Sequence, residues 1–502
     1  MKRSLMIIVF ISVISLMFTH CNNGENTKAT VTTTSKITEI PVSTASKEAQ
    51  EAFKEALQSL DMNDRKKARL LFTKAIEADP KFGLAYLFRA NTSVTNKDYM
   101  DDIMMGKANV DSTSSWEKML GDYMGTNLKG DRIAGMALAE KIASEYPDAA
   151  RAQVQLGSAY DGSNQFDKGR AAYKKAIDLD SNYAGGYAAL TGSYLFSDPK
   201  DLTKAEENAM KAVSLAPKSP GAQIALGDCY RAQNDLQKAQ AAYSKAIELD
   251  PSSPEAYYKL GHANTFMAKY EDARKNYMDG GSHDETKSGA VTNTAYTYLY
   301  AGDPNRSISY IMEEAGKMDA SGTSAKQVTD KLNYLNTAFA IAVHNNDANN
   351  LQKLVPMIKP LSEQLNKDLG NTTETRIFAT ADSLYMQSMI AMAMGKYDEA
   401  KAKLESMKTA LGPIKDDRKL ESYNYNMGLI NMKEKKYTDA IGHFEKADPN
   451  PIYNKYMLAK ANEAAGNKDK AMSFYKEVAA YNFNDVGNAL IRNEVKMKVA
   501  IP

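Results

Sequence analysis

Apolar and small residues recur along most of the chain with the spacing of amphipathic helices. Three stretches, 66–80, 167–181 and 237–251, share one order of residues. In each, a small residue is followed four positions later by an aromatic residue and three positions after that by alanine. This spacing places the apolar residues on one face of a helix. Two of the stretches end in proline, which stops a helix because it lacks an amide hydrogen.

A second pattern lies upstream of these stretches and repeats at a longer interval. Leu156, Leu190, Leu226 and Leu260 follow one another at separations of 34, 36 and 34 residues. Glycine follows three of these leucines, and Thr191 follows the other. A bulky side chain beside a gap lets the next helix pack closely against the first. The pattern therefore predicts a series of helical hairpins.

These spacings and residue types resemble the tetratricopeptide repeat, a helix–turn–helix unit of about 34 residues. The resemblance is best over 150–281, and weaker copies occur near both ends of the chain. It implies an all-α fold, an α-solenoid that winds as a right-handed superhelix. We expect an N-terminal array over 47–281, divergent helical repeats over 282–378 and a C-terminal array over 379–500. The sequence leaves open whether the middle region joins these into one solenoid or separates two arms.

The first residues have the pattern of an export signal. Lys2 and Arg3 precede an apolar run from Leu5 to Phe18 that only two serines interrupt. This length fits a signal-peptide core of about 7–15 residues and is shorter than the ~20 residues that span a bilayer. We therefore expect residues 1–20 to be a signal peptide.

Cys21 follows this apolar run almost directly. The stretch from Leu16 to Cys21 resembles a bacterial lipoprotein signal, in which the cysteine receives lipid and becomes the first residue. The family prefers an aliphatic residue and a small residue where this chain has Phe18 and His20. The resemblance implies palmitate on Cys21 and attachment to the bacterial cell envelope, at the periplasmic face or the outer membrane. The alternative is an ordinary cleaved signal with an incidental cysteine.

Residues 21–46 are rich in threonine and serine and contain few apolar residues. Such a stretch cannot bury enough apolar surface to fold, so it is expected to act as a flexible tether.

Charge and composition narrow the range of functions. Lysine and arginine total 63 and aspartate and glutamate 62, and loss of Lys2 and Arg3 leaves 61 against 62. This balance provides no electrostatic attraction for nucleic acid. Only Cys21 and Cys229 carry thiols, and neither belongs to a CxxC pair. HExxH, GxSxG and phosphate-loop motifs are also missing from the sequence. We therefore expect neither enzymatic activity nor a cofactor or metal.

The family resemblance implies a concave groove lined by the first helix of each hairpin, which would bind a protein or peptide partner. By register, the groove would contain Arg151, Val154, Ser158, Ile224, Asp228, Arg231, Glu255, Tyr258, His262, Tyr425, Tyr453, Tyr456 and Lys460. The resulting hypothesis is a membrane-anchored envelope scaffold. The alternative is a glycan-binding, nutrient-capture lipoprotein of the outer membrane with similar helices. Such proteins often use tryptophan platforms, whereas this chain has only Trp116.

Overall fold

The computed structural model describes residues 41–110, 115–129, 131–318, 324–416, 418–447 and 452–500. Over these residues the chain forms α-helices and no strand, which confirms the predicted all-α fold. The expected signal peptide and Cys21 lie outside the described residues.

The helices of the first half are α1 (Lys47–Asp61), α2 (Arg65–Ala78), α3 (Gly83–Ala90), α4 (Asn96–Val110), α5 (Ser115–Lys129), α6 (Arg132–Glu145), α7 (Ala150–Asp161), α8 (Phe166–Leu179), α9 (Ala184–Phe196), α10 (Leu202–Leu215), α11 (Pro220–Ala232), α12 (Leu236–Leu249), α13 (Pro254–Phe266) and α14 (Tyr270–His283). Those of the second half are α15 (Ser288–Tyr300), α16 (Pro304–Gly316), α17 (Ala325–His344), α18 (Ala348–Asp368), α19 (Thr373–Ala393), α20 (Tyr397–Ala410), α21 (Glu421–Lys433), α22 (Tyr437–Phe444), α23 (Ile452–Ala464), α24 (Lys468–Ala479) and α25 (Val486–Ala500).

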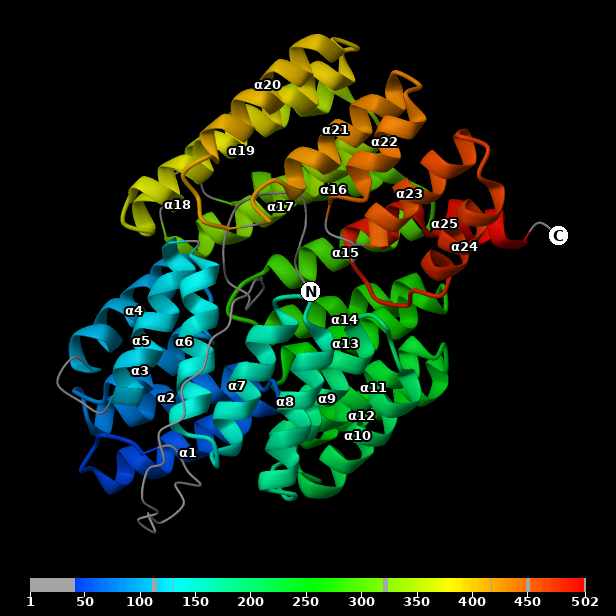
Figure 1. Ribbon diagram of the computed structural model, residues 1–502. Helices are drawn as coiled ribbons and strands as arrows, with labels where there is room; N and C mark the ends of the chain where they lie inside the picture. Colours follow the sequence, from blue (N-terminus) through cyan, green and yellow to red (C-terminus); the bar gives the residue numbers. More distant parts are fainter. Residues whose placement is uncertain are drawn as a thin grey trace, which may run out of the picture.

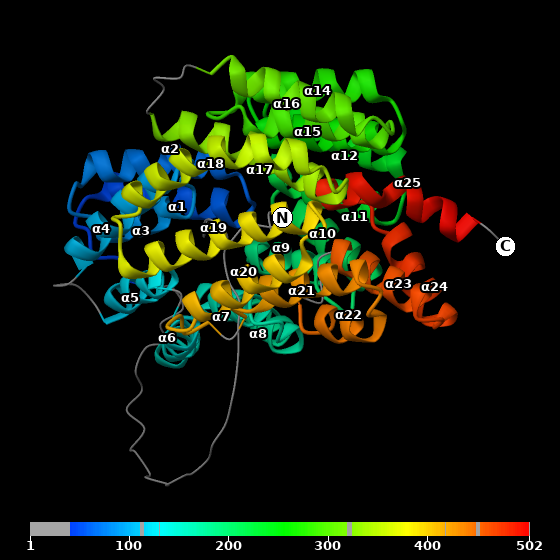
Figure 2. The ribbon, with the colours of Figure 1, turned by 90° about the horizontal axis from the view of Figure 1, so that it is seen from above.

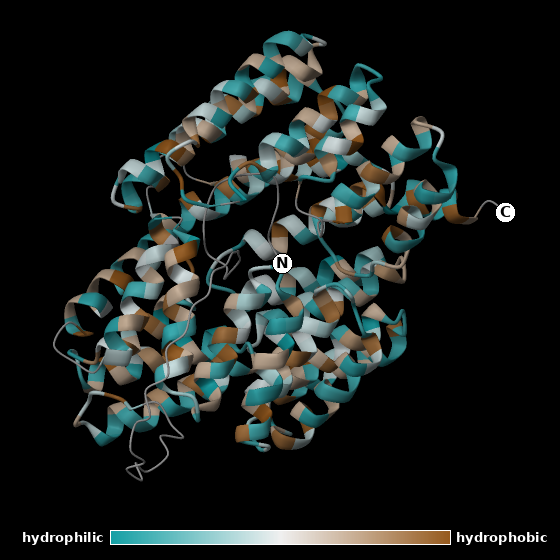
Figure 3. Cartoon of the chain, in the orientation of Figure 1, coloured by the Kyte–Doolittle hydropathy of each residue, from teal (hydrophilic) through white to brown (hydrophobic). Residues whose placement is uncertain are grey.

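Consecutive helices pair as hairpins that stack into a helical-repeat solenoid (Figure 1). The turn of a hairpin is built from polar residues with defined roles. Asn234 adopts a left-handed backbone with φ of 65°, and the Asp235 side chain caps α12 by accepting from the Lys238 amide. Asparagine tolerates this conformation better than most residues, and aspartate is a preferred N-cap. Each helix carries both hydrophilic and hydrophobic residues, as a stacked amphipathic element requires (Figure 3).

The leucine–glycine pairs, and the Met427–Gly428 pair near the C-terminus, act as the sequence predicts, because each glycine receives an aromatic ring from the second helix of its hairpin. A Cβ atom added at the glycine would lie only 2.4–2.5 Å from that ring. The pairs are Gly157 with Tyr173, Gly227 with Tyr243, Gly261 with Tyr277 and Gly428 with Phe444.

Gly261→Ala is expected to destabilise the protein by about 1–3 kcal/mol, because the new methyl group forces the buried Tyr277 ring out of place. Urea unfolding followed by circular dichroism measures the change. Gly192→Ala is the control, since Gly192 lies in α9 and its added Cβ would meet nothing within 4 Å. Equal stability of the two variants would contradict this account of the packing.

The middle of the chain contains the longest helices. The helices α17, α18 and α19 have 20, 21 and 21 residues, whereas α7 to α16 have 12 to 14. The largest hydrophobic cluster of the described residues extends from Val291 to Ala489 and includes side chains of all three long helices. The middle region therefore packs continuously onto its neighbours. Among the described residues, no helix is both long and apolar enough to cross a bilayer.

A helix contacts another that follows it about fourteen helices later in the chain. Successive turns of the superhelix therefore touch. Packing joins α4 to α18, and Arg69 of α2 pairs with Glu285 just after α14 at 2.8 Å. Arg132 of α6 lies 3.2 Å from Asp416, just before α21. The pair Lys455–Asp198 joins α23 to the turn after α9 at 3.2 Å.

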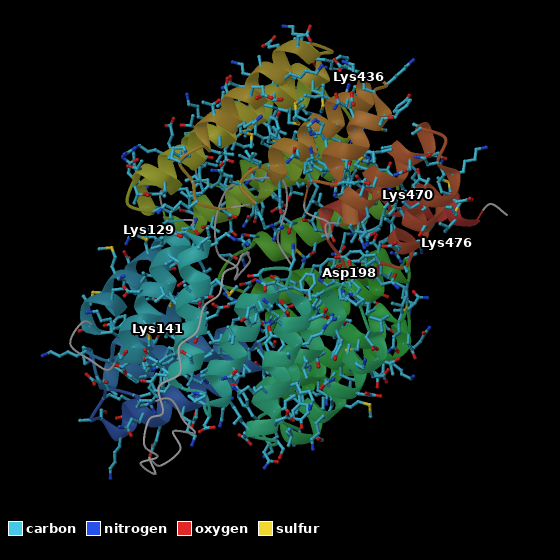
Figure 4. The ribbon with its side chains drawn as sticks, viewed as in Figure 1. Lys129, Lys141, Asp198, Lys436, Lys470 and Lys476 are labelled. Atoms are coloured by element: carbon cyan, nitrogen blue, oxygen red, sulfur yellow. The ribbon has the colours of Figure 1, made fainter. Side chains whose placement is uncertain are left out.

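The contact between turns of the superhelix is visible from two directions. The C-terminal helices lie beside the hairpins of the N-terminal half in both views (Figures 1 and 2). Asp198 is labelled next to the C-terminal helix α24, which carries Lys470 and Lys476 (Figure 4).

Candidate functional site

A loop of the C-terminal region lies across the inner helices of the N-terminal array. We call this loop, residues 481–485 between α24 and α25, the resident segment. Phe483 is its most buried side chain, at 3% exposed. The Phe483 ring centroid lies 4.8 Å from the Arg231 guanidinium carbon and 4.8 Å from the Phe196 ring centroid. The resident segment therefore packs on the ends of α9 and α11.

Asparagine side chains fix the rest of the resident segment. The Asn484 amide nitrogen lies 3.0 Å from His262 Nδ1 of α13 and donates to Asn293 Oδ1 of α15 at 3.0 Å. The Asn482 amide donates to Asn234 Oδ1 in the turn after α11 at 3.3 Å. The resident segment thus spans four neighbouring hairpins by amide hydrogen bonds and one aromatic anchor.

The floor beneath the resident segment is a buried charge network around Asp228. One carboxylate oxygen of Asp228 accepts from Arg231 at 2.8 Å and from the Tyr243 hydroxyl at 2.7 Å, and the other accepts from Lys259 at 2.8 Å. Burial by itself would raise the pKa of Asp228. The positive charges of Lys259 and, to a smaller extent, Arg231 outweigh the effect of burial, so the pKa of Asp228 lies below its usual value.

Arg231 is fully buried, yet its Nε and Nη1 atoms have no hydrogen-bond partner among the residues that the structure describes. Its guanidinium faces the Phe483 ring instead. A cation over an aromatic face is stabilised by the ring quadrupole, more strongly when water is excluded. Phe483 therefore adds a cation–π contact to the charge pair that Arg231 forms with Asp228.

His262 is buried within this network. Its Nδ1 atom lies 3.0 Å from the Tyr277 hydroxyl and 3.0 Å from the Asn484 amide nitrogen. Burial, followed by the positive charges of Arg231 and Lys259, holds the pKa of His262 well below 6.5. The ring is therefore neutral at neutral pH.

The contribution of His262 to the free energy of unfolding is expected to fall as the pH drops below about 6.5. The unfolded chain binds a proton at His262 in that range and the folded chain does not, so acid favours unfolding by up to ~1.4 kcal/mol per pH unit for this residue. Burial lowers the pKa of His344 to about 4. This residue therefore adds a similar dependence of the free energy of unfolding on pH, down to about pH 4. Urea unfolding of H262Q between pH 7 and 5 should show a smaller slope.

H283Q is the matched control for this experiment, because it removes a histidine outside the network. A pH slope in H262Q equal to that of the wild type would contradict the role given to His262.

The other predicted groove residues of the N-terminal array take several positions. Arg151 of α7 forms a bidentate pair with Asp61 of α1, at 2.7 and 2.5 Å. Ile224 and Tyr258 are buried, and the Tyr258 hydroxyl donates to Asp284 at 2.9 Å. Val154, Ser158 and Glu255 are half-buried. Of the residues that the repeat register predicted in this array, Asp228, Arg231 and His262 lie together beneath the resident segment. The other predicted residues pack elsewhere.

The predicted residues of the C-terminal array do form one cluster. Ring centroids are 6.4 Å apart for Tyr425 and Tyr453, and 5.7 Å apart for Tyr453 and Tyr456. The Tyr456 hydroxyl donates to Glu494 of α25 at 2.6 Å, and Lys460 lies 3.3 Å from the same carboxylate. These predicted groove residues therefore contact α25 through Tyr456 and Lys460.

Residues of the resident segment were not predicted from the sequence. They lie outside the helices, so a helical register could not place them. The available signal was local, since Tyr481, Phe483 and three Asn or Asp residues stand together between two helices without helical spacing. Arg492 was missed as well; it donates to the Tyr481 carbonyl at 2.7 Å and the Asn482 side chain at 2.6 Å.

Comparison with known proteins agrees with the repeat pattern. A family model described as TPR repeat matches residues 227–265, and two described as tetratricopeptide repeat match 150–183 and 453–482. No curated protein is significantly similar in sequence to the chain.

Several solved structures share helical repeats with the chain. One is YrrB, described as a TPR protein with an unusual peptide-binding site; it is 18% identical over 36% of this chain and 91% of its own, with a TM-score of 0.27. MamA is 22% identical over 32% of this chain and 94% of its own, with a TM-score of 0.28. The APC/C hetero-tetramer Cut9–Hcn1 is 13% identical over 88% of this chain and 76% of its own, with a TM-score of 0.36. As the three family models show, the chain contains tetratricopeptide repeats, which lie within residues 150–183, 227–265 and 453–482.

Proposed function

We propose that this protein is a membrane-anchored scaffold of the bacterial cell envelope that binds protein or peptide partners through its repeat array. The observation that carries the proposal is the resident segment. The inner helices α9, α11, α13 and α15 hold a non-helical stretch of polypeptide through an aromatic anchor and side-chain amides. A surface that holds the chain's own segment in this way has the chemistry to hold a partner's segment.

The anchoring part of the proposal rests on Cys21 and the tether that follows it. A single acyl chain binds membranes only weakly, whereas more than one gives stable attachment. The Thr- and Ser-rich stretch would let the helical body stand clear of the bilayer.

Cys21→Ala is expected to abolish labelling with radioactive palmitate and to move the protein from the membrane fraction to the soluble fraction. The acyl chains would have no other attachment point, because the thiol is the acceptor group. Ser43→Ala, in the same stretch of the chain, is the control and should leave both readouts unchanged. Palmitate labelling of the Cys21→Ala protein would overturn the lipoprotein assignment.

The binding part is tested by chemical crosslinking in intact cells, followed by purification in detergent and mass spectrometry. The expected result is one or a few envelope proteins whose crosslinks map to the repeat array. Crosslinks that map only to the tether, or that are equally frequent for an unrelated lipoprotein, would argue against a scaffold.

The glycan-binding alternative receives less support from the structure. The single tryptophan, Trp116, is 1% exposed and packs edge-on against Tyr146 in the core of the N-terminal hairpins. It cannot act as an open stacking platform for a sugar ring in this conformation. A protein partner remains the better proposal, and glycan-array binding by the purified protein would reverse that preference. We propose no catalytic role.

A further inference from the structure

The Phe483 ring occupies a socket that the N-terminal array builds. Phe483 belongs to a hydrophobic cluster whose other buried members are Leu195, Ala205, Ala209 and Cys229, and we call these four residues the socket. They come from the consecutive helices α9, α10 and α11. Since the array alone forms the socket, any segment that supplies an aromatic ring of suitable size can fill it.

The helix α25 fixes the main chain of the resident segment from the other side. Asn488 donates to the Phe483 carbonyl at 2.8 Å, and Arg492 donates to the Tyr481 carbonyl at 2.7 Å. A second nitrogen of Arg492 donates to Asn482 Oδ1 at 2.6 Å. The segment is thus held in one conformation by α25 and reaches the array through its side chains. A loop ordered in advance loses little conformational entropy when it binds.

The array recognises rings and amides in this segment. Its uncharged contacts are made by Phe196, Asn234, His262 and Asn293. Its two cations each lie near an aromatic ring of the segment, Arg231 at 4.8 Å from the Phe483 centroid and Lys200 at 5.8 Å from the Tyr481 centroid. Both cations are already paired with carboxylates, Arg231 with Asp228 at 2.8 Å and Lys200 with Asp198 at 3.9 Å. The surface therefore favours an uncharged segment of alternating aromatic and amide side chains.

We propose that the resident segment is an autoinhibitory contact, and that the surface beneath it binds a partner's segment in which aromatic residues alternate with asparagine or glutamine. The proposal rests on the scaffold function and names the partner's chemistry and the regulation of its binding. The partner's ring fills the socket, and its amides bond to Asn234, His262 and Asn293. Residues 481–485 must leave before the partner binds.

The segment already seated on the surface determines this choice of occupant. A competitor with the same side chains replaces each contact one for one. An aliphatic segment loses the contacts between rings and cations, and a charged segment buries a charge whose partner is already engaged. Because the resident segment belongs to the same chain, its effective concentration is high, so a free segment binds weakly until the resident one is released.

The test is a fluorescence-anisotropy titration of the full-length protein, purified in detergent, with a labelled peptide of the sequence of residues 479–493. Two matched peptides have alanine in place of Phe483, or in place of both Asn482 and Asn484. The protein variant F483A releases the segment and leaves the four socket residues intact. The control variant F72A removes an equally buried phenylalanine from α2, in the cluster of the first hairpins, and so separates release of the segment from general loss of stability.

We expect F483A to bind the unaltered peptide at least about tenfold more tightly than the wild type and F72A do. F483A should also prefer this peptide to either matched peptide by at least about tenfold, since the ring and the amides both contribute. F483A/A209L should bind as weakly as the wild type, because the larger side chain fills the socket.

A second variant keeps the test decisive if F483A does not fold. N482A/N484A retains the ring and removes the amide hydrogen bonds to the array, so it loosens the segment less. It should bind the unaltered peptide at least about threefold more tightly than the wild type.

Equal affinity of the wild type and the released variants for the unaltered peptide, or equal affinity of F483A for all three peptides, would overturn the proposal. A wild-type dimer that the peptide dissociates would also overturn it, because the occupant would then be a second copy of the chain. Envelope partners that crosslink equally to the wild type and F483A would leave the scaffold function standing while this surface assignment fails. Peptide binding as expected, without any crosslinked partner, would support displacement of the segment and count against the scaffold function.

Discussion

Asp228→Ala is expected to destabilise the protein by about 3–5 kcal/mol, the usual cost of removing one partner from a buried ion pair. Arg231 would be left as a buried cation without its carboxylate, Lys259 would keep only Glu255 at 3.4 Å, and the Tyr243 hydroxyl would lose its acceptor. Urea unfolding at pH 7, followed by circular dichroism, measures the loss.

The charge network can be separated from simple loss of a side chain. Asp167→Ala removes an exposed aspartate from α8 and should change stability by no more than about 0.5 kcal/mol. D228A/K259M removes one of the stranded cations and should recover part of the loss. If D228A were as stable as D167A, the network would contribute nothing to the fold.

Phe483→Ala is expected to release the resident segment from the inner helices. Removing a buried phenylalanine costs about 3–5 kcal/mol, and the mutation also uncovers the guanidinium of Arg231. In a solenoid each unit is stabilised chiefly by its neighbours, so we expect the loss to appear first at the contact between the resident segment and α9–α15.

Hydrogen exchange measured by mass spectrometry tests this second prediction. Amides of 481–500 should exchange faster in F483A, and those of α11 and α13 should follow, while α1 to α4 stay protected. Leu70→Ala is the control, because Leu70 is 65% exposed and its truncation should leave the exchange pattern unchanged. Unaltered protection of 481–500 in F483A would show that Phe483 does not anchor the segment.

The resident segment also affects how a partner would be bound. Its contacts occupy part of the surface that would otherwise face a ligand, at Arg231 and His262. A partner at this surface must either displace residues 481–485 or bind beside them. The F483A variant therefore provides a way to compare crosslinked partners with the surface covered and uncovered.

The sequence by itself determined the local units of this protein. Within one hairpin, the sequence spacing predicted the contact between the gap at Leu226–Gly227 and the Tyr243 ring. It could do so because these residues lie close together in the chain. Register likewise placed Asp228, Arg231 and His262 on an inner surface. Repeats carry this information locally, since each hairpin packs mainly on its neighbours.

Only the tertiary structure decided what lies on that surface. Phe483 reaches Arg231 across about 250 residues of chain, and Asn484 reaches His262 across 222. No periodicity encodes such contacts, because they depend on the curvature that accumulates over many hairpins until one turn of the superhelix meets the next. The same accumulation brings α4 to α18 and Lys455 to Asp198. A pattern in a single repeat fixes how two helices pack, whereas the summed geometry of all the repeats fixes which distant residues meet.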